Sequence, residues 1–250
     1  MIPTTCQHPG CNSELPTFEF AGNRSIPGSP YCDDHVGLYQ PSQMLKKDLG
    51  QKIAEHNSMW GKYASYDPSL VPLRVIRYHE KGAKHGIVVD ERQAIELIHS
   101  SGKGCILQGD TGFGKTYFLF NLSNFLLRET GRSPLFCYSP QLHYDLADAA
   151  RSDDAGARSR MIAKLTTAGR LFIDDIGSSN WTDSFEEAFK LIIESRSKNG
   201  LATFTSLQQT SEEFINKPTS TSKGSATWKR RDAILRRLID DCLIFKFTAQ

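Results

Sequence analysis

From about residue 90 onwards, short apolar runs alternate with longer stretches of helical periodicity. The runs predicted as strands are Gly104–Gln108, Leu135–Ser139, Arg170–Asp174, Leu201–Ser206 and Cys242–Phe247. The stretches predicted as helices are Lys115–Arg128, 141–149, 157–168, Asp183–Ser197, a short helix that begins at Ser211, and Arg231–Asp240. Because alternating strands and helices pack as a parallel sheet covered by helices, this pattern predicts an α/β domain.

The N-terminal part of the chain has a different pattern. Residues 1–37 are rich in Pro, Gly and Ser, which indicates a small module built on loops. Residues 42–60 carry apolar side chains about every third or fourth position, as a helix does, and residues 61–73 have the composition of a linker. We therefore divide the chain into a module at 1–37, a helix and linker at 38–73, and the α/β domain at 74–250.

The composition is that of a soluble globular protein, with 39% apolar and 23% charged residues and a net charge of +2. No apolar stretch reaches the roughly 20 residues that a membrane helix needs, so we expect no membrane partner. The N-terminus lacks the basic start and apolar run of a secretory signal, which predicts a cytoplasmic protein. The charges are unevenly placed, since residues 1–35 are acidic and residues 223–237 are basic.

A phosphate-binding loop follows the first predicted strand of the domain. Its sequence, Gly109-Asp-Thr-Gly-Phe-Gly-Lys115-Thr116, matches G-x-x-x-x-G-K-T without deviation. In such a loop, backbone N–H groups and the helix N-terminus hold the phosphates, the lysine reaches the outer phosphates and the threonine ligates magnesium. Lys115 is therefore expected to be catalytic as well. The residues expected to bind the triphosphate are Gly109, Asp110, Thr111, Gly112, Phe113, Gly114, Lys115, Thr116 and Tyr117.

Two carboxylates follow one another at the end of the predicted strand Arg170–Asp174. At the end of a buried strand they would lie beside the phosphate loop, where Asp174 holds the magnesium and Asp175 orients or activates the attacking water. Taken alone, two acids here also suit a strand that simply ends in a turn at Gly177. The complete phosphate loop upstream favours the catalytic interpretation.

Over about residues 70–250 the chain resembles the DnaC/IstB branch of the AAA+ ATPases. The resemblance is carried by the phosphate loop and by Val71–Arg74, Ala168–Gly177, Phe189–Arg196 and Thr203–Ser206. It implies an AAA+ P-loop domain with a five-stranded parallel sheet, ATP as the ligand, and activity as a homo-oligomer. Members of this branch load the replicative helicase onto DNA or assist a transposase.

The same resemblance suggests where DNA binds. In this branch an extra helix between the second strand and the acidic strand lines a channel for single-stranded DNA. The corresponding region is 141–168, which carries Arg151, Arg158, Arg160 and Lys164. Basic side chains there would contact phosphates without reading the sequence. A solvated helix face is the alternative for each of them.

Two features depart from the family pattern. The family has an asparagine at the end of the fourth strand, as a sensor near the γ-phosphate. The residue that aligns here is Leu207, so Ser206 or Gln208 has to take that role, and hydrolysis is expected to be slow. The family's late sensor arginine also has no counterpart after the last predicted strand.

An arginine finger is nevertheless available. The segment Ala233–Leu238 resembles the family helix whose arginine reaches the nucleotide of a neighbouring subunit. Arg237 aligns best and Arg236 second. An arginine supplied in trans stabilises charge in the transition state, so this assignment makes full activity depend on oligomerisation. A solvated basic helix end is the alternative.

Three cysteines and a histidine in the N-terminal module have the spacing of a zinc site. Cys6-x4-Cys11 and Cys32-x2-His35 suit a tetrahedral structural zinc, with His8 as a substitute ligand. Thiolates bind zinc in a reducing cytoplasm, and so small a module can hardly fold without such a staple. Three unrelated free cysteines are the alternative. Some helicase loaders of this family carry a zinc domain that grips the helicase, so the resemblance implies a docking module.

Three functions are compatible with these features. The first is an ATP-dependent helicase loader that binds the replicative helicase and single-stranded DNA and hydrolyses ATP. The second is an IstB-like ATPase that assists a transposase on duplex DNA. The third is a nucleotide-gated adaptor with little hydrolysis, which the missing sensor asparagine leaves open.

Overall fold

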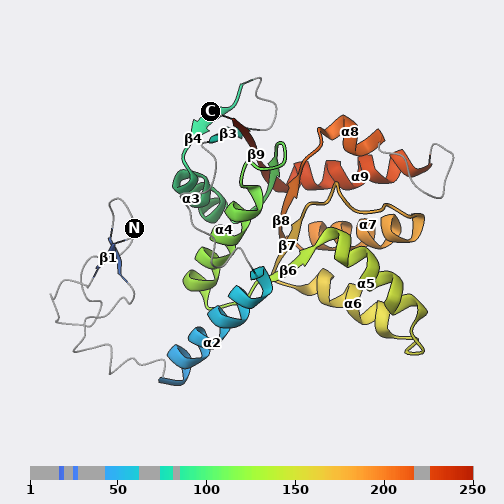
Figure 1. Ribbon diagram of the computed structural model, residues 1–250, viewed down its shortest axis with the longest axis horizontal. Helices are drawn as coiled ribbons and strands as arrows, with labels where there is room; N and C mark the ends of the chain where they lie inside the picture. The colour runs from blue at the N-terminus through green and yellow to red at the C-terminus, as the bar shows by residue number, and fades with distance from the viewer. Residues whose placement is uncertain are drawn as a thin grey trace. The chain divides into compact units, whose positions relative to one another are not determined.

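The computed structural model describes residues 17–19, 25–27, 43–61, 74–80, 85–216 and 226–249 (Figure 1). The chain divides into two units, Met1–Lys52 and Ile53–Gln250. In the first unit, the antiparallel strands β1 (Thr17–Glu19) and β2 (Ser25–Pro27) pair with each other. Helix α2 (Gln43–Trp60) begins in the first unit and ends in the second.

The predicted zinc ligands cannot be placed in this framework. Cys6, Cys11, Cys32 and His35, together with the substitute His8, lie outside the described residues. The zinc site therefore stays a prediction.

The second unit is built on a seven-stranded sheet in the order β4-β3-β9-β5-β8-β7-β6. Five neighbouring strands run parallel, which confirms the predicted α/β fold with a five-stranded parallel sheet. These strands are β5 (Gly104–Gln108), β6 (Leu135–Tyr138), β7 (Arg170–Asp174), β8 (Ala202–Leu207) and β9 (Cys242–Ala249). The order of the strands in the sheet therefore differs from their order in the chain, and β5 lies between β9 and β8.

Three elements were missed in the sequence. Strands β3 (Arg74–His79) and β4 (Ile87–Val89) extend the sheet antiparallel beyond β9, and α3 (Glu91–Ser101) follows them. The signal for α3 was present, because Asp90 and Gln93 form a reciprocal capping box. The two strands carry weaker signals, since β4 has only 3 residues and β3 shows no strict alternation.

Helices cover both faces of the sheet (Figure 1). Helices α3 and α4 (Lys115–Thr130), with the end of α2, pack on one face, around side chains such as Phe172 and Phe204. The helices on the other face are α5 (Ser139–Arg151), α6 (Ala157–Thr167), α7 (Asp183–Lys198), α8 (Ser211–Asn216) and α9 (Ala226–Asp241). Ser139, predicted as the end of a strand, begins α5 instead. None of the helices described here is long and apolar enough to cross a membrane.

A buried arginine connects the layers on that second face. The Arg196 guanidinium donates to the Thr203 hydroxyl at 2.9 Å and to the carbonyls of Leu165, Ala168 and Ala202 at 2.8, 2.6 and 2.6 Å. These acceptors lie at the end of α6 and on β8, and burial lowers the pKa of Arg196 to about 10. The arginine in the family-like segment Phe189–Arg196 is therefore a structural cross-link between helix and sheet.

The last part of α2 is a packed helix. His56 is fully buried, and its Nε2 lies 2.7 Å from the Ser123 hydroxyl on α4. The Trp60 ring is 3% exposed and lies with its centroid 4.0 Å from that of Phe136. Packing against the domain therefore explains the apolar side chains of Ile53–Trp60.

Acidification is expected to weaken this attachment. Burial lowers the pKa of His56 from 6.5, so the folded chain prefers the neutral ring. Its contribution to stability is complete above the unfolded-state pKa of about 6.5 and is lost as the pH falls below it. We expect the thermal unfolding midpoint to fall more for the wild type than for His56→Gln between about pH 7.5 and 5.5, because glutamine does not titrate. An equal fall in both proteins would contradict this role.

Candidate functional site

The candidate site lies where the C-terminal ends of β5, β7 and β8 meet the first turn of α4. The parallel register pairs Gln108 with Leu207 and Ile173 with Thr205, so the ends of these three strands lie at one edge of the sheet. This is the edge at which open α/β sheets bind ligands. The phosphate loop follows β5 at this edge. Asp174 and Asp175 lie at the end of β7 beside the loop.

The backbone of the phosphate loop requires its glycines. Gly109, Gly112 and Gly114 have φ angles of 149°, 91° and 74°, which side chains rarely adopt. A Cβ at Gly109 would also collide with the carbonyl oxygen of Phe247 on β9. Gly114 is the N-cap of α4 and offers no side-chain cap, so the first-turn N–H groups are available to an anion.

Lys115 folds back onto its own loop. The residue is 7% exposed, and its ammonium group donates to the carbonyls of Gly109 and Asp110 at 2.6 and 2.7 Å. Burial lowers the pKa of Lys115, an effect that the nearby Asp175 and Asp174 partly offset. A phosphate anion would compete with two neutral carbonyls for this cation, and the charged partner gives the stronger hydrogen bond.

Asp174 is the buried carboxylate of the site, with 4% exposure. Thr116 Oγ1 donates to its Oδ2 at 2.9 Å, and the Ser206 hydroxyl donates to its Oδ1. Burial raises the pKa of Asp174, which the two hydroxyl donors oppose. A hydroxyl and a carboxylate oxygen side by side are hard ligands that suit magnesium, so the predicted pair Thr116 and Asp174 fits this ion.

The rest of the magnesium shell has to come from elsewhere. Among the residues the structure describes, no group of three or more His, Cys, Asp or Glu side chains could hold a metal ion. Magnesium commonly uses one or two protein ligands together with phosphate oxygens and water, so the pair is sufficient if a nucleotide is bound.

Asp175 has an unusual backbone. Its φ of 57° makes it the only non-glycine residue with positive φ in the described part of the chain. Its N–H donates to Ser206 Oγ at 2.8 Å, whereas its own Oδ1 is buried with no hydrogen-bond partner there. Residues held in sparsely populated conformations cluster at functional sites, and a buried carboxylate oxygen without a donor is suited to accept from a bound water.

The end of β8 shows which residues can replace the family asparagine. Leu207 is 1% exposed and belongs to the apolar cluster under α9, so it takes no part in the site. Ser206 contacts Asp174, and Gln208 accepts from the Thr111 hydroxyl at 3.0 Å. The structure therefore brings both predicted substitutes to the site, one at the acidic strand and one at the phosphate loop.

The two candidate finger arginines differ in their surroundings. Both are exposed on α9, but Arg236 pairs with Asp232 at 2.8 Å. Arg237 makes no hydrogen bond or ion pair with any described residue. By contrast, Arg231 on the same helix is fully buried and pairs with the buried Glu186 at 2.7 Å, so its role is to hold α9 on α7.

The basic residues predicted to line a DNA channel are mostly engaged locally. Arg158 donates to the backbone carbonyl and the hydroxyl of Ser184 at 2.9 and 2.8 Å. The other three residues, Arg151, Arg160 and Lys164, are exposed. Arg151 pairs with Asp148 at 3.4 Å, and Arg160 pairs with Asp154. Exposed ion pairs contribute little stability, so phosphates could displace these acidic partners.

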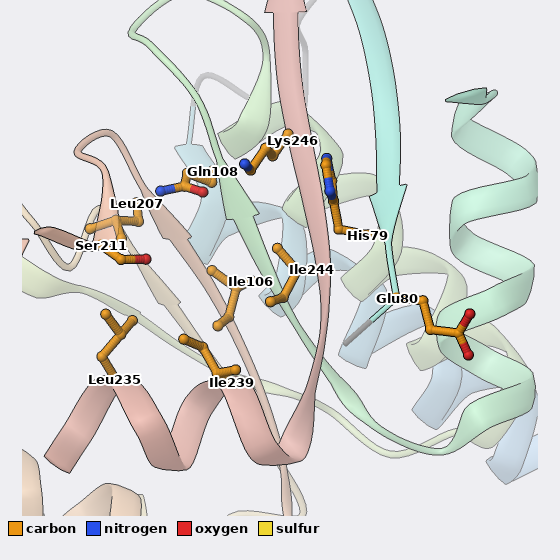
Figure 2. A pocket seen from close by; sticks show the side chains of 10 residues that line it. All are labelled: His79, Glu80, Ile106, Gln108, Leu207, Ser211, Leu235, Ile239, Ile244 and Lys246. Carbon is orange, nitrogen blue, oxygen red and sulfur yellow. The ribbon is translucent and has the colours of Figure 1, made fainter. Parts of the chain in front are cut away.

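Two cavities lie near the loop. One of about 700 Å³ is lined by Gly109, Asp110 and Phe113 on the loop and by the end of β9. The other, of about 250 Å³, lies between α9 and the sheet, with an apolar floor and Lys246 and His79 at its edge (Figure 2). Ligand pockets typically measure about 300–1,000 Å³, so only the first has the size expected for a nucleoside.

A solved structure, that of DnaI, shares this fold. No protein-family model matches the sequence, and a search of curated proteins finds no match. The crystal structure of DnaI has a TM-score of 0.53 at 21% identity, over 63% of this chain and 83% of that chain. The DnaC helicase loader has a TM-score of 0.48 at 17% identity, over 62% and 87%. AMPPCP-bound DnaA from Aquifex aeolicus has a TM-score of 0.44 at 13% identity, over 62% and 43%. The likeness to DnaI is one of fold, and it agrees with the predicted α/β fold.

An asparagine at position 207 is expected to destabilise the fold and not to act as a sensor. Leu207→Asn puts an amide into the apolar cluster under α9, which should cost about 2–4 kcal/mol of folding free energy. We expect the thermal unfolding midpoint to fall by roughly 5–15 °C, with no gain in nucleotide turnover. Gln208→Asn, at the half-buried next position, is the control and should stay stable. Faster turnover in a stable Leu207→Asn protein would contradict the observed orientation of β8.

Proposed function

We propose that the chain is a cytoplasmic, magnesium-dependent ATPase of DNA replication, of the helicase-loader kind. One observation carries the proposal, the meeting of four side chains at one edge of the sheet. They are the buried Lys115 on the phosphate loop, Thr116 hydrogen-bonded to the buried Asp174, and Asp175 with an unpartnered oxygen. A loop that binds phosphate, a pair that suits magnesium and a free carboxylate together fit phosphoryl transfer to water.

In this proposal the triphosphate lies on the N–H groups at the start of α4, and its nucleoside lies in the cavity of about 700 Å³. The ammonium group of Lys115 moves from the loop carbonyls to the outer phosphates. Thr116 and Asp174 hold the magnesium ion, which when bound neutralises charge on the phosphate oxygens.

Asp175 then acts on the attacking water. Its Oδ1 accepts a hydrogen bond from the water, whose oxygen forms a bond to the γ-phosphorus. The bond between this phosphorus and the bridging oxygen breaks, and the water's proton passes towards the carboxylate. Arg237 of a neighbouring copy stabilises the charge that develops, which makes turnover a property of the homo-oligomer.

The partners are assigned by the sequence resemblance. The zinc-binding module predicted at 1–37 docks on the replicative helicase, and the helices of region 141–168 carry basic residues for single-stranded DNA. ATP binding and turnover change the affinity of the chain for these partners. The second candidate is a nucleotide-gated adaptor, favoured by the burial of Leu207 away from the site.

Mixing two inactive variants tests the shared site. We expect Asp175→Asn and Arg237→Ala each to bind ATP but to hydrolyse it on the order of 100-fold more slowly than the wild type. Their mixture should recover turnover, because an Asp175→Asn subunit can lend its Arg237 to the intact site of its neighbour. Arg236→Ala is the matched control and should keep turnover. A mixture as slow as its components contradicts the finger, and ATP binding by Lys115→Ala contradicts the nucleotide site.

A pull-down with ATP from the source organism distinguishes the functions. A loader should retain the replicative helicase, and Cys32→Ser should lose it because a predicted zinc ligand is gone. A transposase helper should instead bind duplex DNA in ATP and ignore the helicase. An adaptor should bind ATP without turnover that is sensitive to Asp175→Asn. Absence of the helicase with the wild-type chain contradicts the loader assignment.

A further inference from the structure

Ser206 lies between the two carboxylates of the candidate site. It is 2% exposed on β8, the strand next to β7. Its hydroxyl donates to Asp174 Oδ1 and accepts from the Asp175 N–H at 2.8 Å. Its backbone carbonyl accepts from the Ile176 N–H at 3.0 Å. One residue of β8 thus contacts three consecutive residues, the last residue of β7 and the two that follow it.

These contacts set the direction of the Ser206 hydroxyl. A hydroxyl has one proton and two lone pairs, and the Asp175 N–H uses one lone pair. An ionised carboxylate can only accept, so the single proton has to point at Asp174. With Thr116 on Oδ2 and Ser206 on Oδ1, the carboxylate of Asp174 cannot rotate without breaking a hydrogen bond at each of its oxygens. A carboxylate held in this way is preorganised as a metal ligand.

The same hydroxyl also stabilises the turn at Asp175. A left-handed backbone is unfavourable for a non-glycine residue and persists only where its surroundings enforce it. Here the N–H of Asp175 and the N–H of Ile176 both find acceptors on Ser206, so two consecutive backbone donors of the turn are bound to one residue of β8. The backbone of this turn sets the direction of the Asp175 carboxylate. The Oδ1 of this carboxylate has no hydrogen-bond partner among the described residues.

We propose that Ser206 is a positioning residue that aligns both carboxylates at once, Asp174 towards the metal and Asp175 towards the attacking water. The proposal rests on the proposed function and names the residue of this chain that couples metal binding to water activation. Substitution of the ligand partners that orient a metal ligand commonly costs 10- to 100-fold in metal affinity or activity.

The neighbouring position supplies a matched control. Successive residues of a strand point to opposite faces, so Thr205 faces away from the site. It is fully buried, and its hydroxyl has no partner among the described residues. Thr205→Val removes a buried hydroxyl from the same strand at nearly constant volume. Its effect on folding should be neutral or stabilising, because no hydrogen bond is lost.

The experiment measures the affinity for a fluorescent ATP analogue as a function of magnesium concentration, in Ser206→Ala, Ser206→Thr, Thr205→Val and wild-type proteins. In EDTA all four should bind alike, within about twofold, because the phosphate loop is unchanged. The magnesium concentration for half-maximal effect should rise by about 10-fold or more in Ser206→Ala and stay unchanged in Thr205→Val. Ser206→Thr keeps the hydroxyl and should restore the wild-type value. Turnover of Ser206→Ala should fall mainly in kcat.

Several outcomes would overturn the proposal. One is a magnesium requirement in Ser206→Ala equal to that of the wild type, and another is an equal shift in Thr205→Val. If Ser206→Ala does not fold, Ser206→Cys fills a similar volume with a weaker donor and should shift the requirement in the same direction, and no shift there contradicts the role. A wild-type chain that binds no nucleotide contradicts the proposed function itself, which distinguishes that failure from a failure of Ser206 alone.

Discussion

The carboxylate of Asp174 is the charge around which the site is arranged. It is almost fully buried at the end of β7, and its partners come from two other elements, Thr116 on α4 and Ser206 on β8. Burial of an isolated charge in such a place is energetically unfavourable. Hydroxyl donors reduce this penalty without neutralising the carboxylate. The group thereby keeps its capacity to bind a cation while it also links the phosphate loop to the fourth parallel strand.

Side chains along β8 point alternately to the two faces of the sheet, so that the residue in contact with the site and the residues packed under the helices lie on different faces. Phe204 and Ser206 face α4, and Ser206 reaches the acidic strand, whereas Thr203 and Leu207 face the helices of the other layer. A shift of one residue in this strand would exchange the two sets. Arg196 helps to hold this register, because it donates to the Thr203 hydroxyl and the Ala202 carbonyl near the start of the strand. The arrangement of the candidate site therefore also depends on a buried arginine near the start of β8.

A second buried cation sets the position of α9. Arg231 pairs with Glu186 on α7 and lies over the Trp181 ring at 5.4 Å. Removing one partner of such a pair commonly costs about 3–5 kcal/mol, because the other charge stays buried. The exposed Arg237 lies on the same helix, so its position also depends on this anchor. On the other face, His56 fastens the end of α2 to α4, the helix that begins at Lys115.

The sequence by itself determined the alternating α/β pattern, the phosphate loop and the acidic strand end, because these depend on local periodicity and on motifs of fixed spacing. Strands β5, β7 and β8 lie close to their predicted bounds for that reason. The antiparallel edge formed by β3 and β4 depends on pairing with β9, more than 150 residues away, and no local signal marks such a contact. The sequence alone also did not decide whether Ser206 or Gln208 takes the place of the sensor asparagine. Only the packing of β8 between β5 and β7 decided that Leu207 is buried under α9, that Ser206 contacts both acidic residues, and that Gln208 reaches Thr111.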